Sequence, residues 1–149
     1  MKKILFVLVF FVISNNINAQ SAKAQINAKD TARASYKSLK IVFQLTTADT
    51  ILHQTFMNQL KNYFSVAPNL KVEVVCHGAG LNMLVKKNSV VQEQIKKFSE
   101  KGVKFVACEF SMAKNKITKD QLVAEASTVT SGVLEIAKKQ QEGWSYIKL

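Results

Sequence analysis

Glycine, proline and cysteine are scarce in this sequence of 149 residues, which contains 5 Gly, 1 Pro and 2 Cys. So little Gly and Pro, together with 48% hydrophobic residues, excludes a collagen-like or disordered chain. Two cysteines are too few for a disulfide-rich mini-protein or a four-cysteine zinc site. Acidic residues are scarce as well, 10 against 21 basic ones, which gives a formal net charge of +11. The length suits one domain with a core of two or three layers.

The first 19 residues have the layout of a secretory signal peptide. Lys2 and Lys3 precede an apolar run from Ile4 to Ile13, and small or polar residues then lead to Ala19. A membrane-spanning helix needs about 20 apolar residues, so this run is too short to span. We expect cleavage after Ala19, an exported protein that is periplasmic or secreted, and no membrane span in the mature chain. A buried N-terminal strand or an uncleaved interfacial anchor is the alternative.

The positive charge is spread along the chain. It divides into +2 for the signal peptide at residues 1–19, +3 for residues 20–38 and +6 for residues 39–149. Residues 20–38 are rich in Ala, Ser, Lys and Gln and are expected to form a flexible leader before a domain at 39–149. The basic residues of that domain occur singly or in pairs on the polar faces of expected helices, without interleaved aromatic residues. We therefore expect no nucleic-acid partner.

Strand-like and helical patterns alternate from residue 39 onward. Short apolar runs predict five strands, at residues 40–45, 71–77, 103–108, 127–130 and 144–149. Apolar residues recur at helical spacing between them, and the capping-box spacings Ser89–Gln92 and Thr118–Gln121 predict two of the helix starts. This alternation indicates an α/β domain in which helices cover both faces of a five-stranded, mostly parallel sheet.

The carboxyl ends of parallel strands are where ligands and chemistry gather in such folds. Polar residues follow the first three expected strands at that edge. We take the following as candidate site residues: Thr46, Thr47 and Asp49 after the first strand, Cys76, His77, Gly78 and Gly80 at the end of the second, and Cys108 at the end of the third.

Cys108 is the strongest candidate. A thiol just past a buried strand can be partly exposed, and a loop with Lys114 and Lys116 could stabilise its thiolate. The adjacent Glu109 would disfavour the thiolate, and cysteine often fills a core without reacting. From the residues alone, a reactive Cys108 and a buried Cys108 both remain open.

The other candidates each have a plain structural explanation. Cys76 is expected to be a small buried hydrophobe. A labile Cys76–Cys108 disulfide also remains open, because neighbouring strands would place the two Cα atoms within bonding range. His77 is either a proton donor or acceptor beside Cys108, or a turn residue bonded to backbone. Asp49 is expected to cap a helix. The spacing of His53 relative to these residues matches no metal-ligand pattern, so no metal is expected.

Three segments resemble the DsrE/DsrF-like family. Residues 74–81 (VVCHGAGL) form an apolar strand that enters a His-Gly-x-Gly turn, and residues 102–108 (GVKFVAC) form a strand that ends in Cys. Residues 140–147 (QQEGWSYI) match the Gln-x-x-Gly-Trp-x-Tyr ending of one subgroup. The three occur in the family's order, and the resemblance covers essentially all of residues 39–149.

The resemblance implies a three-layer α/β/α domain with a five-stranded parallel sheet, assembled as a homo-oligomer such as a trimer or hexamer. In sulfur-relay members a Cys at the end of the third strand carries sulfur as a persulfide, and Cys108 has that position here. His77 matches the His-Gly turn. The partners would be a sulfur donor or acceptor protein or a small thiol, with no organic cofactor or metal. The alternatives are a non-catalytic oligomeric binding or scaffold protein of the same fold, and a thiol redox sensor that uses Cys76 and Cys108.

Overall fold

A computed structural model of the chain describes Thr31, Tyr36 and residues 38–149. The expected signal peptide at 1–19, and all but three residues of the expected leader at 20–38, lie outside the described residues. Ser38–Leu149 form one compact unit, and every element named below belongs to it.

A five-stranded sheet forms the centre of this unit, and each pair of neighbouring strands is parallel. The order across the sheet is β4-β3-β2-β1-β5, so the chain moves outward from β1 in one direction and returns to place β5 on its other side. The strands are β1 (Lys40–Leu45), β2 (Lys71–Cys76), β3 (Lys104–Cys108), β4 (Ala126–Val129) and β5 (Ser145–Lys148). The predicted parallel five-stranded sheet is confirmed.

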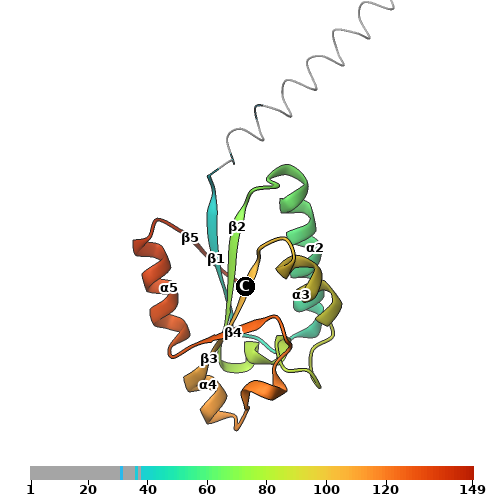
Figure 1. Ribbon diagram of the computed structural model, residues 1–149, viewed down its shortest axis with the longest axis vertical. Coiled ribbons are helices and arrows are strands. Elements are labelled where there is room, and N and C mark those ends of the chain that lie inside the picture. Colours follow the sequence, from blue (N-terminus) through green and yellow to red (C-terminus); the bar gives the residue numbers. More distant parts are fainter. Residues whose placement is uncertain (1–30, 32–35, 37) are drawn as a thin grey trace, which may run out of the picture. The chain divides into compact units, whose positions relative to one another are not determined.

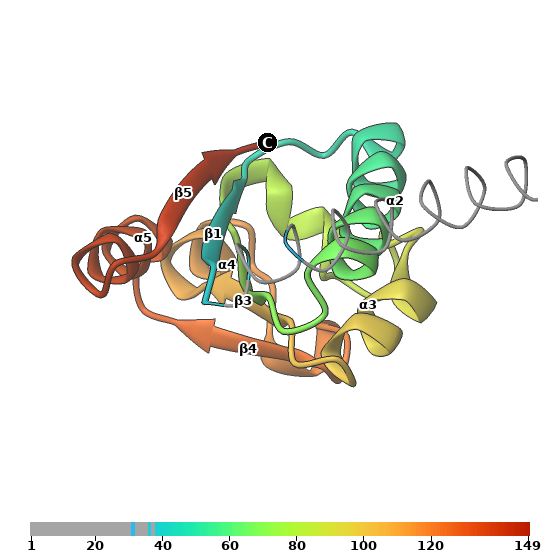
Figure 2. The ribbon, with the colours of Figure 1, turned by 90° about the horizontal axis from the view of Figure 1, so that it is seen from above.

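Helices cover both faces of the sheet (Figures 1 and 2). α2 (Thr50–Val66) and α3 (Gln92–Ser99) lie on one face, in connections that move across the sheet from β1 toward β4. α5 (Gly132–Gln141) connects β4 back to β5 and lies on the other face. Crossover connections between parallel strands are right-handed, so reversing the direction of travel moves the helix to the opposite face. The result is the expected α/β/α layering.

Shorter helical segments follow the carboxyl ends of two strands. The 3-10 helix η1 (Gly78–Met83) comes after β2, and α4 (Glu109–Lys114) comes directly after β3. A second 3-10 turn, η2 (Lys119–Gln121), leads toward β4. These segments surround the edge of the sheet at which the sequence places its candidate site.

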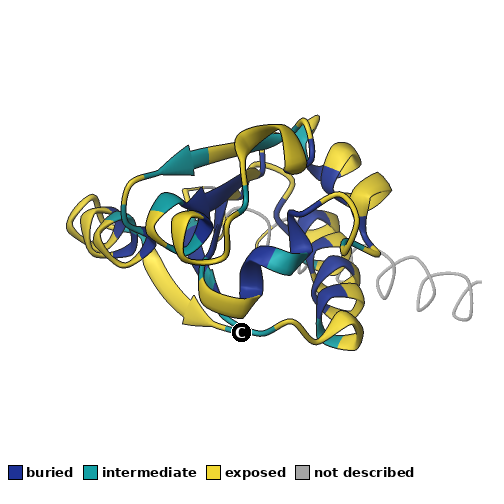
Figure 3. Cartoon of the chain, turned by 90° about the horizontal axis from the view of Figure 1, so that it is seen from below, coloured by how far each residue is buried: buried dark blue, intermediate teal, exposed yellow. Residues whose placement is uncertain are grey.

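Successive residues of each strand face opposite helical layers. The larger hydrophobic cluster lies between the sheet and the α2 and α3 layer, and it includes Phe43, Cys76 and Phe105 from the strands. The smaller cluster lies beneath α5 and comprises Val42, Val75, Val106 and Ile136. Figure 3 shows the central strands buried between helices whose outer surfaces are exposed, whereas the edge strands β4 and β5 are intermediate and exposed. Whether a residue has an odd or even position in its strand therefore decides which helical layer its side chain meets.

The two capping-box predictions have different outcomes. The Ser89–Gln92 box does not form, because α3 begins at Gln92 itself and the Gln92 amide donates to the carbonyls of Lys86 and Ser89. The Thr118–Gln121 box does form, but it starts only the three-residue turn η2. The helix expected after Gln121 does not form, because Leu122 pairs with Val85 in an isolated bridge and a turn then leads to Ala126, where β4 begins.

A nearly buried ion pair holds α5 against the sheet. Lys139 Nζ lies 3.3 Å from Glu73 Oε2 on β2, and Glu135 and Glu142 of the same helical region contact Lys139 at 3.5 Å each. Burial raises the pKa of Glu73 above its ordinary value even though Lys139 acts in the opposite direction. Glu73 Oε1 has no hydrogen-bond partner, so Lys139 is the group that compensates this carboxylate.

We expect Lys139→Met to lower the free energy of unfolding by about 3 kcal/mol, because it leaves a buried carboxylate without a partner. Lys138→Met, at an exposed position of the same helix, is the matched control and should change it by less than about 0.5 kcal/mol. Adding Glu73→Gln to Lys139→Met should recover part of the loss. Urea unfolding followed by circular dichroism measures all three. Equal losses for the two lysine variants would contradict the role of the pair.

Candidate functional site

The carboxyl ends of β2 and β3 meet the first turn of α5. Gly132, the first residue of α5, is packed so closely there that an added Cβ would lie 3.0 Å from Val75 Cγ1, 3.2 Å from Cys108 Cβ and 3.4 Å from His77 Cβ. Cys108 and His77 therefore flank the same point on the α5 face of the sheet. Of the candidate residues, these two are the ones that the fold brings together.

Cys108 occupies a sharp change of direction in the backbone. It is the last residue of β3 and also the N-cap of α4, with φ −78° and ψ 118°. The first N–H groups of a helix have no partner within it, so that of Ser111 is available to the sulfur, and that of Phe110 is shared between the sulfur and the Thr130 carbonyl, which lies 3.3 Å away. Gly132 contributes a further N–H from the start of α5. Two helix starts thus converge on one sulfur atom.

These donors set the protonation state of the thiol. Burial raises the pKa of Cys108, but hydrogen bonds to its sulfur from the N–H groups of Gly132, Ser111 and Phe110 and from the Ser111 hydroxyl lower it. The net pKa lies below the ordinary 9.0. When protonated, the thiol contacts the Thr130 carbonyl at 3.9 Å. Cys108 is 6% exposed, so the sulfur is bound in a polar nest rather than in free solution. The arrangement favours a thiolate.

Glu109 does not oppose this thiolate in the expected way. Its carboxylate accepts a hydrogen bond of 2.7 Å from the Thr128 hydroxyl and lies 3.3 Å from Lys119 Nζ. These two partners hold the pKa of Glu109 below its ordinary value. The carboxylate is thus compensated by η2 and β4.

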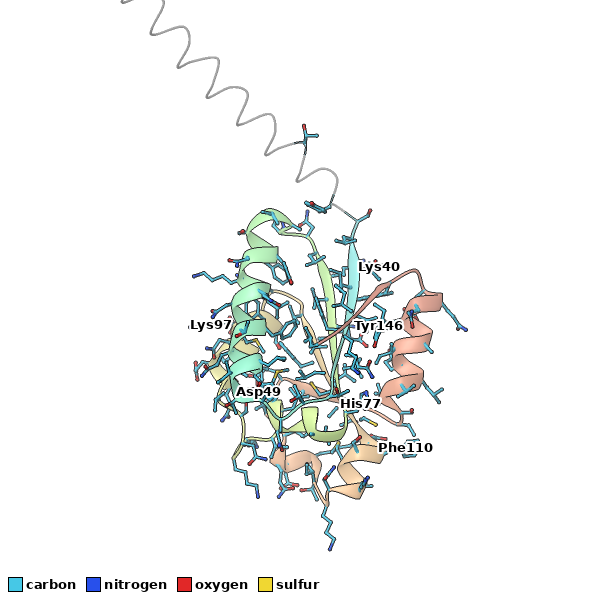
Figure 4. The ribbon with its side chains drawn as sticks, turned by 180° about the vertical axis from the view of Figure 1, so that it is seen from behind. Lys40, Asp49, His77, Lys97, Phe110 and Tyr146 are labelled. Atoms are coloured by element: carbon cyan, nitrogen blue, oxygen red, sulfur yellow. The ribbon has the colours of Figure 1, made fainter. Side chains whose placement is uncertain are left out.

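His77 follows β2 and is half-buried on the same face as Cys108. Burial, and then the positive charge of Lys148, lower the pKa of His77, which favours the neutral imidazole. Its Nε2 lies 2.7 Å from Nε2 of the Gln44 amide on β1. The hydroxyl of Tyr146 on β5 donates to Oε1 of that amide. Figure 4 shows His77 near the end of the sheet, between Tyr146 on one side and Phe110 on the other.

Cys76 lies on the opposite face of the sheet. Its register partner on β3 is Ala107, and both belong to the cluster beneath α2 and α3, whereas Cys108 contacts the start of α5. Burial raises the pKa of Cys76 far above its ordinary value. The sheet thus separates the two thiols, both of which are free. The Cys76–Cys108 disulfide that the sequence leaves open is wrong, because adjacent strand positions point their side chains to opposite faces.

The remaining candidates position the backbone. Asp49 caps α2 by accepting from the N–H groups of Ile51 and Leu52, and Thr47 Oγ1 accepts from the Asp49 N–H at 3.1 Å. These two residues serve the helix start. Figure 4 shows Asp49 at the beginning of α2, and it makes none of the contacts to Cys108 described above.

The two glycines have separate roles. Gly78, with a φ of +56°, donates its N–H at 2.9 Å to the hydroxyl of Ser111, which in turn binds Cys108. Gly78 therefore supports the sulfur site indirectly. Gly80 packs against the backbone of Leu45 and Thr46 so tightly that a Cβ would lie 2.1 Å from the Leu45 carbonyl oxygen. Gly80 and the backbone of Thr46 thus determine how closely the turn packs on the end of β1, and neither is among the contacts of the Cys108 sulfur described above.

Five residues contribute to the site beyond the predicted ones: Gln44, Phe110, Ser111, Gly132 and Tyr146. Of these, Gln44 could have been noticed in the sequence, because it is a polar residue within an otherwise apolar strand.

In the part of the chain that the structure describes, no three His, Cys, Asp or Glu side chains lie together as metal ligands. Within the same part, no helix is long and apolar enough to cross a membrane.

Comparison with known proteins agrees with this fold. The model of the DsrE/DsrF-like family matches residues 8–149. The solved structure of MTH1491 from Methanobacterium thermoautotrophicum, described as a protein of unknown function, is 26% identical, with a TM-score of 0.71 over 75% of this chain and 100% of that one. The ychN protein of E. coli is 12% identical, with a TM-score of 0.58 over 76% of this chain and 99% of that one. No curated protein sequence matches the chain.

We expect the ultraviolet absorbance of the Cys108 thiolate to rise with pH around a midpoint below 9.0, because the bound N–H groups favour the charged form. Cys108→Ser should remove this step and Cys76→Ser should keep it. Ser111→Ala should move the midpoint upward, since the thiolate loses a hydrogen bond. Ser65→Ala, an exposed position on α2, is the control. A wild-type midpoint at or above 9.0 would contradict the description of the nest.

Proposed function

The chain belongs to the DsrE/DsrF-like family, and from that premise we propose that it is an exported protein whose Cys108 carries sulfur as a persulfide. Family membership supports a function of the sulfur-relay type. The observation that carries the proposal is the set of N–H and hydroxyl donors around Cys108 Sγ, which lower the pKa of the thiol at the carboxyl edge of the sheet. A scaffold protein that retained only the fold would have no need of these donors.

In the sulfur uptake step the Cys108 thiolate displaces the thiolate of the donor from a sulfur atom. The Cys108 thiolate attacks the outer sulfur of a donor R–S–SH, and a bond forms between Sγ and that sulfur. The S–S bond of the donor breaks, and the donor leaves as R–S⁻. The sulfur atom moves without a net gain or loss of electrons, so the step requires no separate oxidant or reductant.

Release of sulfur follows the same path in reverse. The thiolate of an acceptor attacks the outer sulfur of the Cys108 persulfide, and Cys108 leaves as a thiolate. The N–H groups of Gly132, Ser111 and Phe110 bind the negative sulfur both when it attacks and when it departs. Donors that are already in place for the charged sulfur stabilise it without reorganising, which lowers the barrier in both directions.

A partner would approach over an apolar rim. Phe110, at the start of α4, is 64% exposed, and Val133 and Leu134, in the first turn of α5, are 58% and 69% exposed. These side chains begin the two helices whose N–H groups bind the sulfur. Exposed apolar groups at this position support a protein partner, either a sulfur donor or acceptor or another copy of the chain in a trimer or hexamer. A small persulfide is the simpler donor, and a small thiol is the simpler acceptor.

Export follows from the N-terminal pattern. The full-length chain is expected to be found outside the cytoplasm with Gln20 as its first residue, because signal peptidase would cut after Ala19. N-terminal sequencing of protein from the periplasmic or secreted fraction measures this. Protein that stays in the cytoplasm with residues 1–19 intact would contradict the export part of the proposal. The sulfur chemistry at Cys108 does not depend on this result and has its own test.

Mass spectrometry of the folded protein tests the sulfur chemistry. After incubation with a small persulfide, Cys108 should gain the mass of one sulfur atom, and addition of dithiothreitol should remove it. Cys76→Ser should behave like the wild type, because the Cys76 sulfur is enclosed in the core. Cys108→Ser should gain no sulfur. The proposal fails if folded wild-type protein gains no sulfur at Cys108, or if Cys108→Ser gains as much.

A further inference from the structure

Gln44 is a polar side chain placed between two aromatic groups on the α5 face of the sheet. Its register partners are Val75 on β2 and Lys148 on β5, so its amide lies over the carboxyl half of β1 between those strands. The amide contacts one residue on each side. Oε1 accepts a hydrogen bond from the Tyr146 hydroxyl, and Nε2 lies 2.7 Å from Nε2 of His77.

The donor and acceptor inventory of these groups determines where the protons lie. An amide nitrogen is only a donor, so the Nε2 atom of His77 that faces it must be the acceptor. A neutral imidazole has one N–H and one acceptor nitrogen, and the proton of His77 is therefore on Nδ1. In this orientation the Tyr146 hydroxyl donates to Oε1 and leaves the NH₂ group for His77, whereas a flipped amide would require the hydroxyl to accept and His77 to donate from Nε2.

The charged groups around His77 agree with a neutral ring. Lys148 of β5 is the charged group that acts on the His77 ring, and Gly132 of α5 brings no side chain against it. Burial and Lys148 both lower the pKa of His77. Protonation would also place an N–H of the ring against the NH₂ group of Gln44, so two donors would face each other.

We propose that Gln44 and Tyr146 are positioning residues that hold His77 in the neutral Nδ1–H tautomer. His77 then has no free lone pair with which to take up a proton, and its remaining polar function is donation from Nδ1–H. If the proposed sulfur transfer is correct, on which this consequence rests, His77 acts as a hydrogen-bond donor to negative sulfur and not as a general base. Neutral histidines serve as such donors in known active sites.

The tautomer is measured directly by long-range proton–nitrogen correlation spectra of ¹⁵N-labelled protein. The chain has two histidines, and loss of one set of signals in His77→Asn assigns the ring of interest. The wild type should show a protonated Nδ1 and an unprotonated Nε2. Gln44→Glu should reverse this, because a carboxylate only accepts and therefore requires a proton on Nε2. The same change should raise the pKa of His77.

Tyr146→Phe tests the outer part of the arrangement. It keeps the ring and removes the hydroxyl that orients the amide, so the spectrum should become a mixture of both tautomers and sulfur uptake at Cys108 should slow roughly fivefold. Tyr63→Phe is the matched control, since its hydroxyl has only a long contact of 3.5 Å to Gln59 on α2. It should leave the tautomer and the uptake rate unchanged. Thermal unfolding of both variants accounts for any general loss of structure.

Two results would overturn the inference: an Nε2–H tautomer in the wild type, or a tautomer that Tyr146→Phe and Gln44→Glu both leave unchanged. Neither result depends on sulfur. An Nδ1–H tautomer that responds to both variants supports the inference even where Cys108 fails to gain sulfur, in which case the proposed function alone is contradicted.

Discussion

The structure depends on the close contact between Gly132 and the carboxyl ends of β2 and β3. The absence of a side chain at Gly132 lets α5 begin close against Val75, His77 and Cys108, where a Cβ would lie only 3.0–3.4 Å from them. That contact brings the first N–H of α5 to the Cys108 sulfur, where it joins two N–H groups from α4. The buried pair of Lys139 and Glu73 fixes the same helix further along its length. A packing constraint and an ion pair thus produce the electrostatic environment of one thiol.

The alternation of side chains along the strands places the two cysteines on opposite faces of the sheet, where their pKa values shift in opposite directions. Cys76 faces the large core beneath α2 and α3, where burial keeps it a thiol. Cys108 faces α5, where backbone donors outweigh burial and favour the thiolate. The same alternation places Gln44, His77 and Tyr146 on the α5 side. One face of the sheet is therefore packed core, and the other holds the thiol with the lowered pKa and the polar groups near it, at the edge where parallel sheets place their sites.

The sequence predicted the strands to within a residue, because continuous apolar runs and turn residues are local signals. Cys108 at the functional edge followed from the parallel topology. The face that each side chain meets could not be predicted in the same way, which is why the Cys76–Cys108 disulfide was left open and is wrong. The role of Gln44 could not be predicted from the sequence either, because its hydrogen bond with Tyr146, 102 residues away, depends on the pairing of β5 with β1. The capping box at Ser89 does not form, because the Gln92 side chain donates to the carbonyls of Lys86 and Ser89 instead of accepting from the backbone N–H, as a capping box requires.

The central claim, that the start of α5 helps to lower the pKa of Cys108, is tested most directly by the pH dependence of Cys108 alkylation in Gly132→Ala. The added methyl group would lie 3.0–3.4 Å from Val75, Cys108 and His77, which is tight enough to press the helix start and the end of β3 apart by a few tenths of an ångström. Iodoacetamide reacts with the thiolate, and its rate against pH gives the midpoint of ionisation. The account predicts a midpoint moved to higher pH in a folded variant. A folded variant with the wild-type midpoint would contradict it.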